Sequence, residues 1–173
     1  MSNIQSDVVF NGFGESSDAH HISAPHPEGH GAAQAMLSAL NRAGLSAQDI
    51  NYINLHGTGT VQNDAMEAKA VSQVFKQDTL CSASKQLHGH CLGAAGAIEA
   101  GLCWLLLSEE NTDNLFPIMK FSDDFDKNID KINLISESHQ PAKTLQHCMS
   151  NSYAFGGNNA SLILSKSSAF SPI

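Results

Sequence analysis

Hydrophobic residues recur along the chain with two spacings, which separate expected strands from expected helices. Short apolar, β-branched runs bounded by polar or glycine residues indicate strands. They cover residues 7–13, 50–55, 79–82, 132–135, 147–150 and 160–164. Apolar residues at helical spacing predict two helices between these runs. One covers residues 32–43 and is ended by Gly44, and the other begins at Asn63 or Asp64 and ends at Phe75.

A third stretch, Leu92 to Leu107, is apolar on every side and predicts another helix. A helix without a polar stripe is a buried one, and this one is too short and too rich in glycine to span a membrane. Its single acid, Glu99, must find a partner or accept a raised pKa. Lys85 and His90 precede its positive amino end, so a site for an anionic group is expected there. The alternative is a core helix with incidental polar residues at its mouth.

The order of these elements predicts an α/β fold. Strands that alternate with helices, followed by consecutive strands, favour a mixed sheet with helices on its faces. We expect a sheet of five strands, flanking helices, one buried central helix and a single domain over residues 1–173. Residues 14–31 predict a long loop with several histidines, and Ser46–Asp49 resembles a helix capping box.

Charge and composition exclude several classes of protein. The chain has 173 residues, 42% of them hydrophobic, and a net charge of −8, which argues against a nucleic-acid or anionic-membrane binder. No apolar run follows a basic segment near residue 1, so we expect a cytoplasmic protein without a secretory signal. The cysteines form no C-x-x-C pair, which favours free thiols over disulfides or a zinc site. They are Cys81, Cys91, Cys103 and Cys148.

Candidate chemistry is concentrated in glycine-rich segments that follow strands. His56-Gly-Thr-Gly-Thr60 leaves the strand at 50–55, and α/β sheets place their ligands at the carboxyl ends of strands. Glycine lets the backbone approach a substrate, and a neutral imidazole can donate a hydrogen bond. Phe155 lies in the glycine-rich segment 151–159 and suits a movable wall of an apolar channel. Each segment, considered alone, also fits an ordinary turn.

Motifs in these segments follow one another in a fixed order along the chain. They are Ser16-Ser-Asp-Ala-His-His21, His56-Gly-Thr-Gly-Thr60 with Asp64-x-x-Glu67, Ser84-Lys85-x-x-x-Gly89-His90-x-x-Gly-Ala-Ala-Gly-Ala-x-Glu99-Ala, and Asn151-Ser-Tyr-Ala-Phe155-Gly-Gly157-x-Asn159. Together they resemble, in order and spacing, the carboxyl-terminal half of a β-ketoacyl-[acyl-carrier-protein] synthase. The resemblance implies a thiolase-like fold and a condensing enzyme of fatty-acid or polyketide synthesis.

The resemblance also implies roles for the polar residues. In the family, an acyl chain is carried on a cysteine, and malonyl-acyl-carrier-protein is decarboxylated to a carbanion that attacks it. His56 and His90 correspond to histidines that hydrogen-bond the thioester oxygen and stabilise the enolate, which is oxyanion-type catalysis. Lys85 corresponds to a lysine that is tied to acids such as Asp64 and Glu67.

The remaining implied roles concern the surroundings of the histidines. Glu99 corresponds to a buried glutamate beneath the second histidine, and Thr58 and Thr60 to positions that contact the phosphopantetheine arm. That arm arrives on the acyl carrier protein, so no cofactor or metal of the chain's own is implied. The residues expected at a gate over the substrate are Phe155 and Gly156, with Asp18 and His21 on the loop that meets it.

The chain also departs from the family pattern. The nucleophilic cysteine of the family belongs to an amino-terminal half that these residues do not contain. Asp78-Thr-Leu-Cys81-Ser imitates the nucleophile's pattern, but a place on a strand favours an unreactive thiol at Cys81. The gate begins Tyr153-Ala-Phe where Phe-Gly-Phe is commoner, and the resemblance gives His88 no role.

Without the other half, the helix at 92–107 would expose an apolar face to water. We therefore expect a homodimer through this helix or a longer parent protein, an acyl carrier protein as partner, and no activity of the chain alone. The alternative is a non-catalytic partner subunit, similar to chain-length factors, which lack the nucleophile and shape the acyl tunnel. Retention of His56 and His90 favours the enzyme. The sequence does not specify the acyl-chain length or the choice between fatty-acid and polyketide synthesis.

Overall fold

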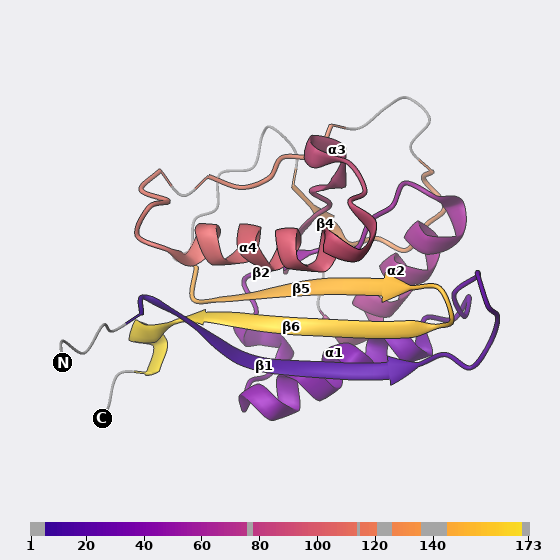
Figure 1. Cartoon of the computed structure of the whole chain (residues 1–173), viewed down its shortest axis with the longest axis horizontal. Helices are drawn as coiled ribbons and strands as arrows, with labels where there is room; N and C mark the ends of the chain where they lie inside the picture. Colours follow the sequence, from indigo (N-terminus) through magenta and orange to yellow (C-terminus); the bar gives the residue numbers. More distant parts are fainter. Residues whose placement is uncertain (1–5, 76–77, 114, 121–125, 136–144, 171–173) are drawn as a thin grey trace.

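One mixed sheet organises the chain in the computed structural model, which describes residues 6–75, 78–113, 115–120, 126–135 and 145–170. Its strand order is β1-β6-β5-β2-β3-β4 (Figure 1). The central pairs are parallel, whereas β6 is antiparallel to both β5 and β1. The bounds are β1 (Val8–Ser17), β2 (Tyr52–Asn54), β3 (Leu80–Ser82), β4 (Asn133–Leu134), β5 (His147–Ala154) and β6 (Asn158–Lys166). The prediction of five strands is wrong, because all six apolar runs join this sheet.

Helices cover both faces of the sheet. On one face α1 (His30–Ala43) packs against α2 (Val61–Val74), and on the other α4 (Ala95–Leu107) packs on β5 and β6 (Figure 1). Side chains of β5 alternate between two hydrophobic clusters, so that Met149 faces α1 and α2 while Cys148 faces α4. The short helices are η1 (Ala47–Asp49), α3 (Lys85–His88), η2 (Leu92–Ala94) and η3 (Ser167–Phe170). In the described ranges, no helix combines the length and the apolar character needed to cross a bilayer.

Helix ends follow local sequence. Gly44 ends α1 in the left-handed conformation, with φ 66°, as the sequence predicts. The capping box of Ser46 and Asp49 is also present, although it opens the 3₁₀ helix η1. The predicted start of α2 at Asn63 or Asp64 is wrong, because the hydroxyl of Thr60 accepts from the Asn63 N–H at 3.4 Å and begins the helix earlier.

Two strands extend into segments predicted as connections. β1 continues to Ser17, so the loop that follows covers residues 18–29 instead of 14–31. The glycines of this strand allow close contact with α1, since a Cβ at Gly14 would lie 1.9 Å from the Ala35 carbonyl oxygen. β5 continues to Ala154, so the turn before β6 contains only residues 155–157.

The apolar helix α4 is buried on one side only. Its buried residues recur at every fourth position: Ala95, Glu99, Cys103 and Leu107. On the outer side, Ile98, Trp104 and Leu105 are 37%, 39% and 48% exposed. The prediction of a fully buried helix is therefore wrong for this chain, and the expectation of an apolar face in contact with water is confirmed. The helix begins at Ala95, so His90 precedes its first turn by several residues.

Candidate active site

Two imidazoles meet near the carboxyl ends of β2 and β3. His56 lies two residues after the end of β2 and is 7% exposed, whereas His90 is exposed in the segment between α3 and η2. The ring centroids are 5.7 Å apart, and the ring planes cross at 88°. The expected convergence of the rings is thus present, and the spacing allows a single small acceptor to receive a hydrogen bond from both.

Lys85 determines which nitrogen of His56 can donate. The Nζ of Lys85 lies 3.3 Å from Nδ1 of His56 and also donates to the backbone carbonyl of the same residue. An ammonium has no lone pair, so Nδ1 is the acceptor and Nε2 carries the ring proton. Burial lowers the pKa of His56 to about 3, and the charges of Lys85 and His90 act in the same direction. His56 is therefore a neutral donor at physiological pH.

Glu99 is the acid that pairs with Lys85. Glu99 is fully buried on α4, and its Oε1 forms an ion pair with the Nζ of Lys85. Burial raises the pKa of Glu99, and the contact with Lys85 opposes that rise. The expectation that Glu99 finds a partner or accepts a raised pKa is confirmed, since Lys85 pairs with it and burial still raises its pKa. The expectation that Asp64 and Glu67 hold Lys85 is wrong, because the loop after β3 turns the lysine toward α4.

Glu67 instead shapes the segment that carries His56. Its two carboxylate oxygens accept from the backbone N–H groups of His56 and Gly57, each at 2.8 Å. The side-chain amide of Asn151 adds a longer contact of 3.4 Å. Complete burial raises the pKa of Glu67 to about 7 despite these donors. Glu67 thus acts on the candidate site through the backbone of β2 and its following residues.

The pH dependence of stability separates the effects of Glu67 and His56. The folded pKa of Glu67, about 7, lies above its ordinary value of 4.5, so its contribution to stability is complete below 4.5 and is lost as the pH rises through 7. The folded pKa of His56, about 3, lies below 6.5, so its contribution is complete above 6.5 and is lost as the pH falls toward 3. The two slopes oppose each other between pH 4.5 and 6.5.

We expect Glu67→Gln to remove the contribution of Glu67 to the pH dependence of stability. Relative to the wild type, the free energy of unfolding of this variant should then rise with pH in the shared window, by at most about 1.4 kcal/mol per pH unit. Urea titrations at several pH values measure the change, with Glu110→Gln, a substitution of an exposed acid, as the control. Parallel pH profiles for the wild type and Glu67→Gln would contradict the raised pKa of Glu67.

A cavity of about 280 Å³ opens beside His90. Its lining includes apolar residues that follow β2 and β3, together with residues of α2 and β4: Leu55, Ala83, Ala68 and Leu134. Thr58 and Asp64 line this cavity, whereas Thr60 does not. The Thr60 hydroxyl lies 3.0 Å from that of Thr58 and caps α2, so Thr58 is the hydroxyl of this pair that faces the cavity.

The turn at residues 155–157 is held by the loop at residues 18–29. Phe155 is 80% exposed at its tip. The N–H of Gly156 donates to the carbonyl of Ile22 at 2.7 Å, and the N–H of Asp18 donates to the carbonyl of Gly157 at 2.8 Å. Gly157 has φ +75°, and a Cβ there would lie 2.9 Å from the Cβ of Asp18. Glycine is therefore required for this close approach.

Asp18 is the side chain through which the loop contacts the turn. Its carboxylate accepts from the Asn159 side-chain amide at 2.8 Å and from the His26 N–H at 2.9 Å. The ring of His21, which the resemblance also places near the gate, is exposed and accepts from the Ser23 N–H at 3.2 Å. The structure brings Asp18 together with Gly157 and Asn159, beside the turn that carries Phe155 and Gly156, and it leaves the ring of His21 exposed.

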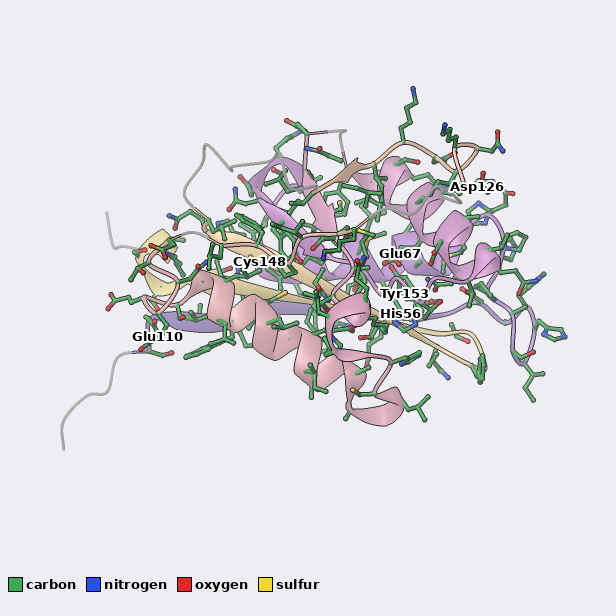
Figure 2. All side chains as sticks on the ribbon, turned by 90° about the horizontal axis from the view of Figure 1, so that it is seen from above. His56, Glu67, Glu110, Asp126, Cys148 and Tyr153 are labelled. Carbon is green, nitrogen blue, oxygen red and sulfur yellow. The ribbon has the colours of Figure 1, made fainter. Side chains whose placement is uncertain are left out.

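Two side chains near the site lie in a segment that the sequence pattern assigns to a turn. Asn151 is fully buried beside Glu67, and the ring of Tyr153 packs edge-to-face on His56 with 5.5 Å between centroids. Figure 2 shows Tyr153, His56 and Glu67 at one end of the sheet. Their signal in the sequence is the alternation that continues past Ser150, with Met149, Asn151 and Tyr153 on one face of β5.

The thiols of the chain are free and mostly buried. Burial raises the pKa of Cys81 and Cys148 well above the ordinary value and that of Cys103 to about 12. Cys91 is half-buried, with its sulfur 3.8 Å from the carbonyl oxygens of His88 and Gly89. The expected place of Cys81 on a strand is confirmed, and its burial and raised pKa are in keeping with an unreactive thiol. Among the residues that the structure describes, no group of three or more His, Cys, Asp or Glu side chains is placed to hold a metal ion.

The mixed sheet, the two helical layers and the paired imidazoles define a thiolase-like domain. Residues 8–116 match the family model described as "Beta-ketoacyl synthase, C-terminal domain". The chain belongs to the β-ketoacyl synthase family, as the motifs in its sequence suggest. The fold and the resemblance inferred from sequence are both confirmed.

Curated relatives include the 3-oxoacyl-[acyl-carrier-protein] synthase 2 of Staphylococcus aureus (strain COL), which is 36% identical over 168 residues. The protein of the same name from Vibrio cholerae is 34% identical over 167 residues. These alignments cover 95% and 94% of this chain but 39% of each relative. The chain thus spans about two fifths of the length of these relatives.

Solved structures show the same partial coverage. A chain in the complex of the ketosynthase ApeO with its chain length factor ApeC, from Xenorhabdus doucetiae, is 50% identical with a TM-score of 0.87. The match covers 94% of this chain and 40% of that one. A β-ketoacyl synthase from Burkholderia phymatum is 34% identical with a TM-score of 0.80, with 92% and 38% covered.

Proposed function

We propose that this chain supplies the His56, His90 and Lys85 half of a site for decarboxylative condensation of malonyl-acyl-carrier-protein with an acyl thioester. The observation that carries the proposal is the pair of imidazole rings 5.7 Å apart. The environment of His56 keeps its ring neutral and directs its proton to Nε2. Fixed donors in a site shielded from water stabilise an oxyanion as it forms, which is usually the largest single contribution to catalysis.

In the proposed reaction the bond between the malonyl carboxylate and the α-carbon breaks, and carbon dioxide leaves. The electron pair stays on the thioester as an enolate, whose oxygen accepts hydrogen bonds from His56 and His90. The α-carbon of the enolate then attacks the carbonyl of the acyl thioester, and the thiolate that carried the acyl group leaves. Lys85 holds His56 in the donor tautomer, and Glu99 balances the charge of Lys85.

The acyl-carrying thiol of this reaction comes from outside the 173 residues. The buried cysteines have raised pKa values, and a thiol must ionise before it can attack a thioester. An amino-terminal half supplies the nucleophile in this proposal, in keeping with the greater length of the relatives. The chain alone is inactive. The phosphopantetheine arm of the carrier protein reaches the site past Thr58, which lines the cavity.

The outer face of α4 is the surface that meets the missing half or, in isolation, a second copy. We expect the isolated chain to self-associate through this face, and Trp104→Glu to abolish the association because a charge would have to be buried. Light scattering over a range of concentrations measures the change. Val61→Glu is the control, because Val61 is 81% exposed on α2, on the opposite side of the sheet. A wild-type chain that stays monomeric and binds no hydrophobic dye would contradict this role of α4.

The alternative function is a non-catalytic subunit similar to a chain length factor. It is kept because similar chains occur in solved assemblies of a ketosynthase with its chain length factor. One assay of the full-length protein separates the two functions. An enzyme forms a β-ketoacyl product from acyl-carrier and malonyl-carrier substrates, and alkylation of its thiol stops the reaction. A partner subunit forms no product until a second, thiol-bearing protein is added.

A further inference from the structure

The peptide group between His56 and Gly57 is held from both sides by charged side chains. Its carbonyl accepts from the Nζ of Lys85, and its N–H donates to Oε2 of Glu67 at 2.8 Å. The N–H of His56 itself donates to the other carboxylate oxygen of Glu67, also at 2.8 Å. Gly57 has φ +40°, a left-handed conformation that glycine adopts readily. The direction in which the His56 side chain leaves the backbone therefore depends on the place of the Glu67 carboxylate.

The carboxylate of Glu67 needs donors of its own. Glu67 is 2% exposed and reaches the backbone of His56 from α2, and a buried carboxylate is costly unless donors surround it. Among the described side chains, that of Asn151 donates to it, from Nδ2 to Oε1 at 3.4 Å. Burial raises the pKa of Glu67 to about 7, and its hydrogen bonds, that with Asn151 included, oppose the rise. Asn151 thus favours the ionised form, in which both oxygens accept.

Ser161 orients the amide of Asn151. A side-chain amide can rotate so that its oxygen and nitrogen exchange places, so a further contact is needed to present the nitrogen to Glu67. Ser161 lies opposite Asn151 in the antiparallel pairing of β5 with β6, and its hydroxyl donates to Oδ1 of Asn151 at 2.8 Å. Nδ2 then faces Glu67, with the sulfur of Met36 at 3.5 Å as a second, weak acceptor. Asn151 and Ser161 are both fully buried.

We propose that Asn151 is a positioning residue for the condensation: it holds the carboxylate of Glu67 in the place from which that acid fixes the backbone of His56. Ser161 gives the amide of Asn151 the orientation that this role requires. The inference rests on the proposed function, in which the His56 ring donates to the oxyanion. Misplacing a reacting group by about 1 Å can slow a reaction about 10²-fold, so a contact that fixes a donor from outside the site affects the rate.

A purely structural role for Asn151 is the competing explanation, because a buried amide with partners also stabilises the fold. Asn151→Leu alone does not separate the two roles, since it leaves the hydroxyl of Ser161 buried without its acceptor. Asn151→Leu combined with Ser161→Ala separates them, because removing both partners of a buried hydrogen bond can be nearly neutral for stability. Leucine keeps the branched shape of asparagine, and the double variant leaves Glu67 without its side-chain donor.

The test uses the full-length protein that contains this chain. In the double variant we expect a Tm within about 3 °C of the wild type. Hydrogen exchange of the His56 and Gly57 amides, relative to the amides of β2, should nevertheless become at least about tenfold faster. We also expect kcat for the release of carbon dioxide to fall about tenfold, with KM changed less than about twofold, because the substrate itself loses no contact.

Ser165→Ala is the matched control for Ser161→Ala. Ser165 is also fully buried on β6, and its hydroxyl lies 2.7 Å from Nδ1 of its partner in register on β5, His147. Both alanine variants remove one buried hydroxyl, so both should lower the Tm by a similar amount. Ser165→Ala should leave kcat and the exchange at His56 and Gly57 unchanged, because His147 is at the other end of β5 from Asn151.

A double variant in which kcat recovers together with the Tm would overturn the proposal, because Asn151 would then serve stability alone. Unchanged exchange at His56 and Gly57 would overturn it as well. If the double variant does not fold, the single variants give the answer: faster exchange in Ser161→Ala than in Ser165→Ala supports the proposal, and equal exchange in the two refutes it. The exchange measurement requires no turnover, whereas the proposed function fails by a different result, full decarboxylation by His56→Ala.

Discussion

Replacing His56 or His90 by alanine is expected to lower the release of carbon dioxide from malonyl-acyl-carrier-protein by about 10²–10³-fold in the full-length protein that contains this chain. In the proposed mechanism, each ring supplies a hydrogen bond to the oxygen on which negative charge develops. His56 is held in place before the reaction by Lys85, so no reorganisation is needed as the charge forms. The measurement is release of labelled carbon dioxide at saturating substrate.

The double variant separates a shared role from two independent roles. If both rings donate to one oxygen, as proposed, the double variant His56→Ala with His90→Ala should be only slightly slower than the less active single variant. Independent roles would instead give the product of both losses in rate. His20→Ala is the matched control, since that exposed imidazole lies on the loop at residues 18–29. Unchanged turnover in either single variant would remove that histidine from the mechanism.

Lys85→Met is expected to lower the free energy of unfolding by about 3–5 kcal/mol, because it leaves the carboxylate of Glu99 buried without its cation. Lys85→Met combined with Glu99→Leu should recover most of that loss, since the buried charge is removed along with its partner. Urea unfolding at neutral pH gives both values.

Lys69→Met provides the comparison for this pair. Lys69 forms an ion pair with Glu28 at 3.0 Å, but the two side chains are 35% and 52% exposed. The expected cost is below about 1 kcal/mol. If Lys85→Met costs no more than Lys69→Met, the buried pair does not stabilise the chain. If the double variant is as unstable as Lys85→Met, the loss arises from the contact of Lys85 with the His56 backbone.

The meeting of His56 and His90 can be predicted from sequence because both follow strands whose carboxyl ends share one edge of the sheet. The acidic partner of Lys85 cannot be predicted from the sequence in this way. Glu67 and Glu99 are both acids at plausible positions along the chain, and the choice between them depends on how α4 packs beneath the loop after β3. Linear spacing does not specify that packing.

Strand ends are mispredicted for a related reason. Glycine in β1 suggests a loop, yet Gly12 and Gly14 allow close packing on α1 within a strand that continues past a register shift between Phe10 and Gly12. Asn151 and Tyr153 look like turn residues beside Phe155, yet antiparallel pairing with β6 keeps them extended. In both places tertiary contacts override local propensity.

Within this chain, the buried charge of helix α4 is paired, but the helix is not fully shielded from solvent. The ion pair between Lys85 and Glu99 is complete within these residues, so the local charge is neutralised without outside help. Solvent is not fully excluded from α4, because the outer side of the helix is exposed. Whatever polypeptide covers that side lowers the dielectric around the imidazoles and strengthens their hydrogen bonds, even if it contributes no reactive group of its own.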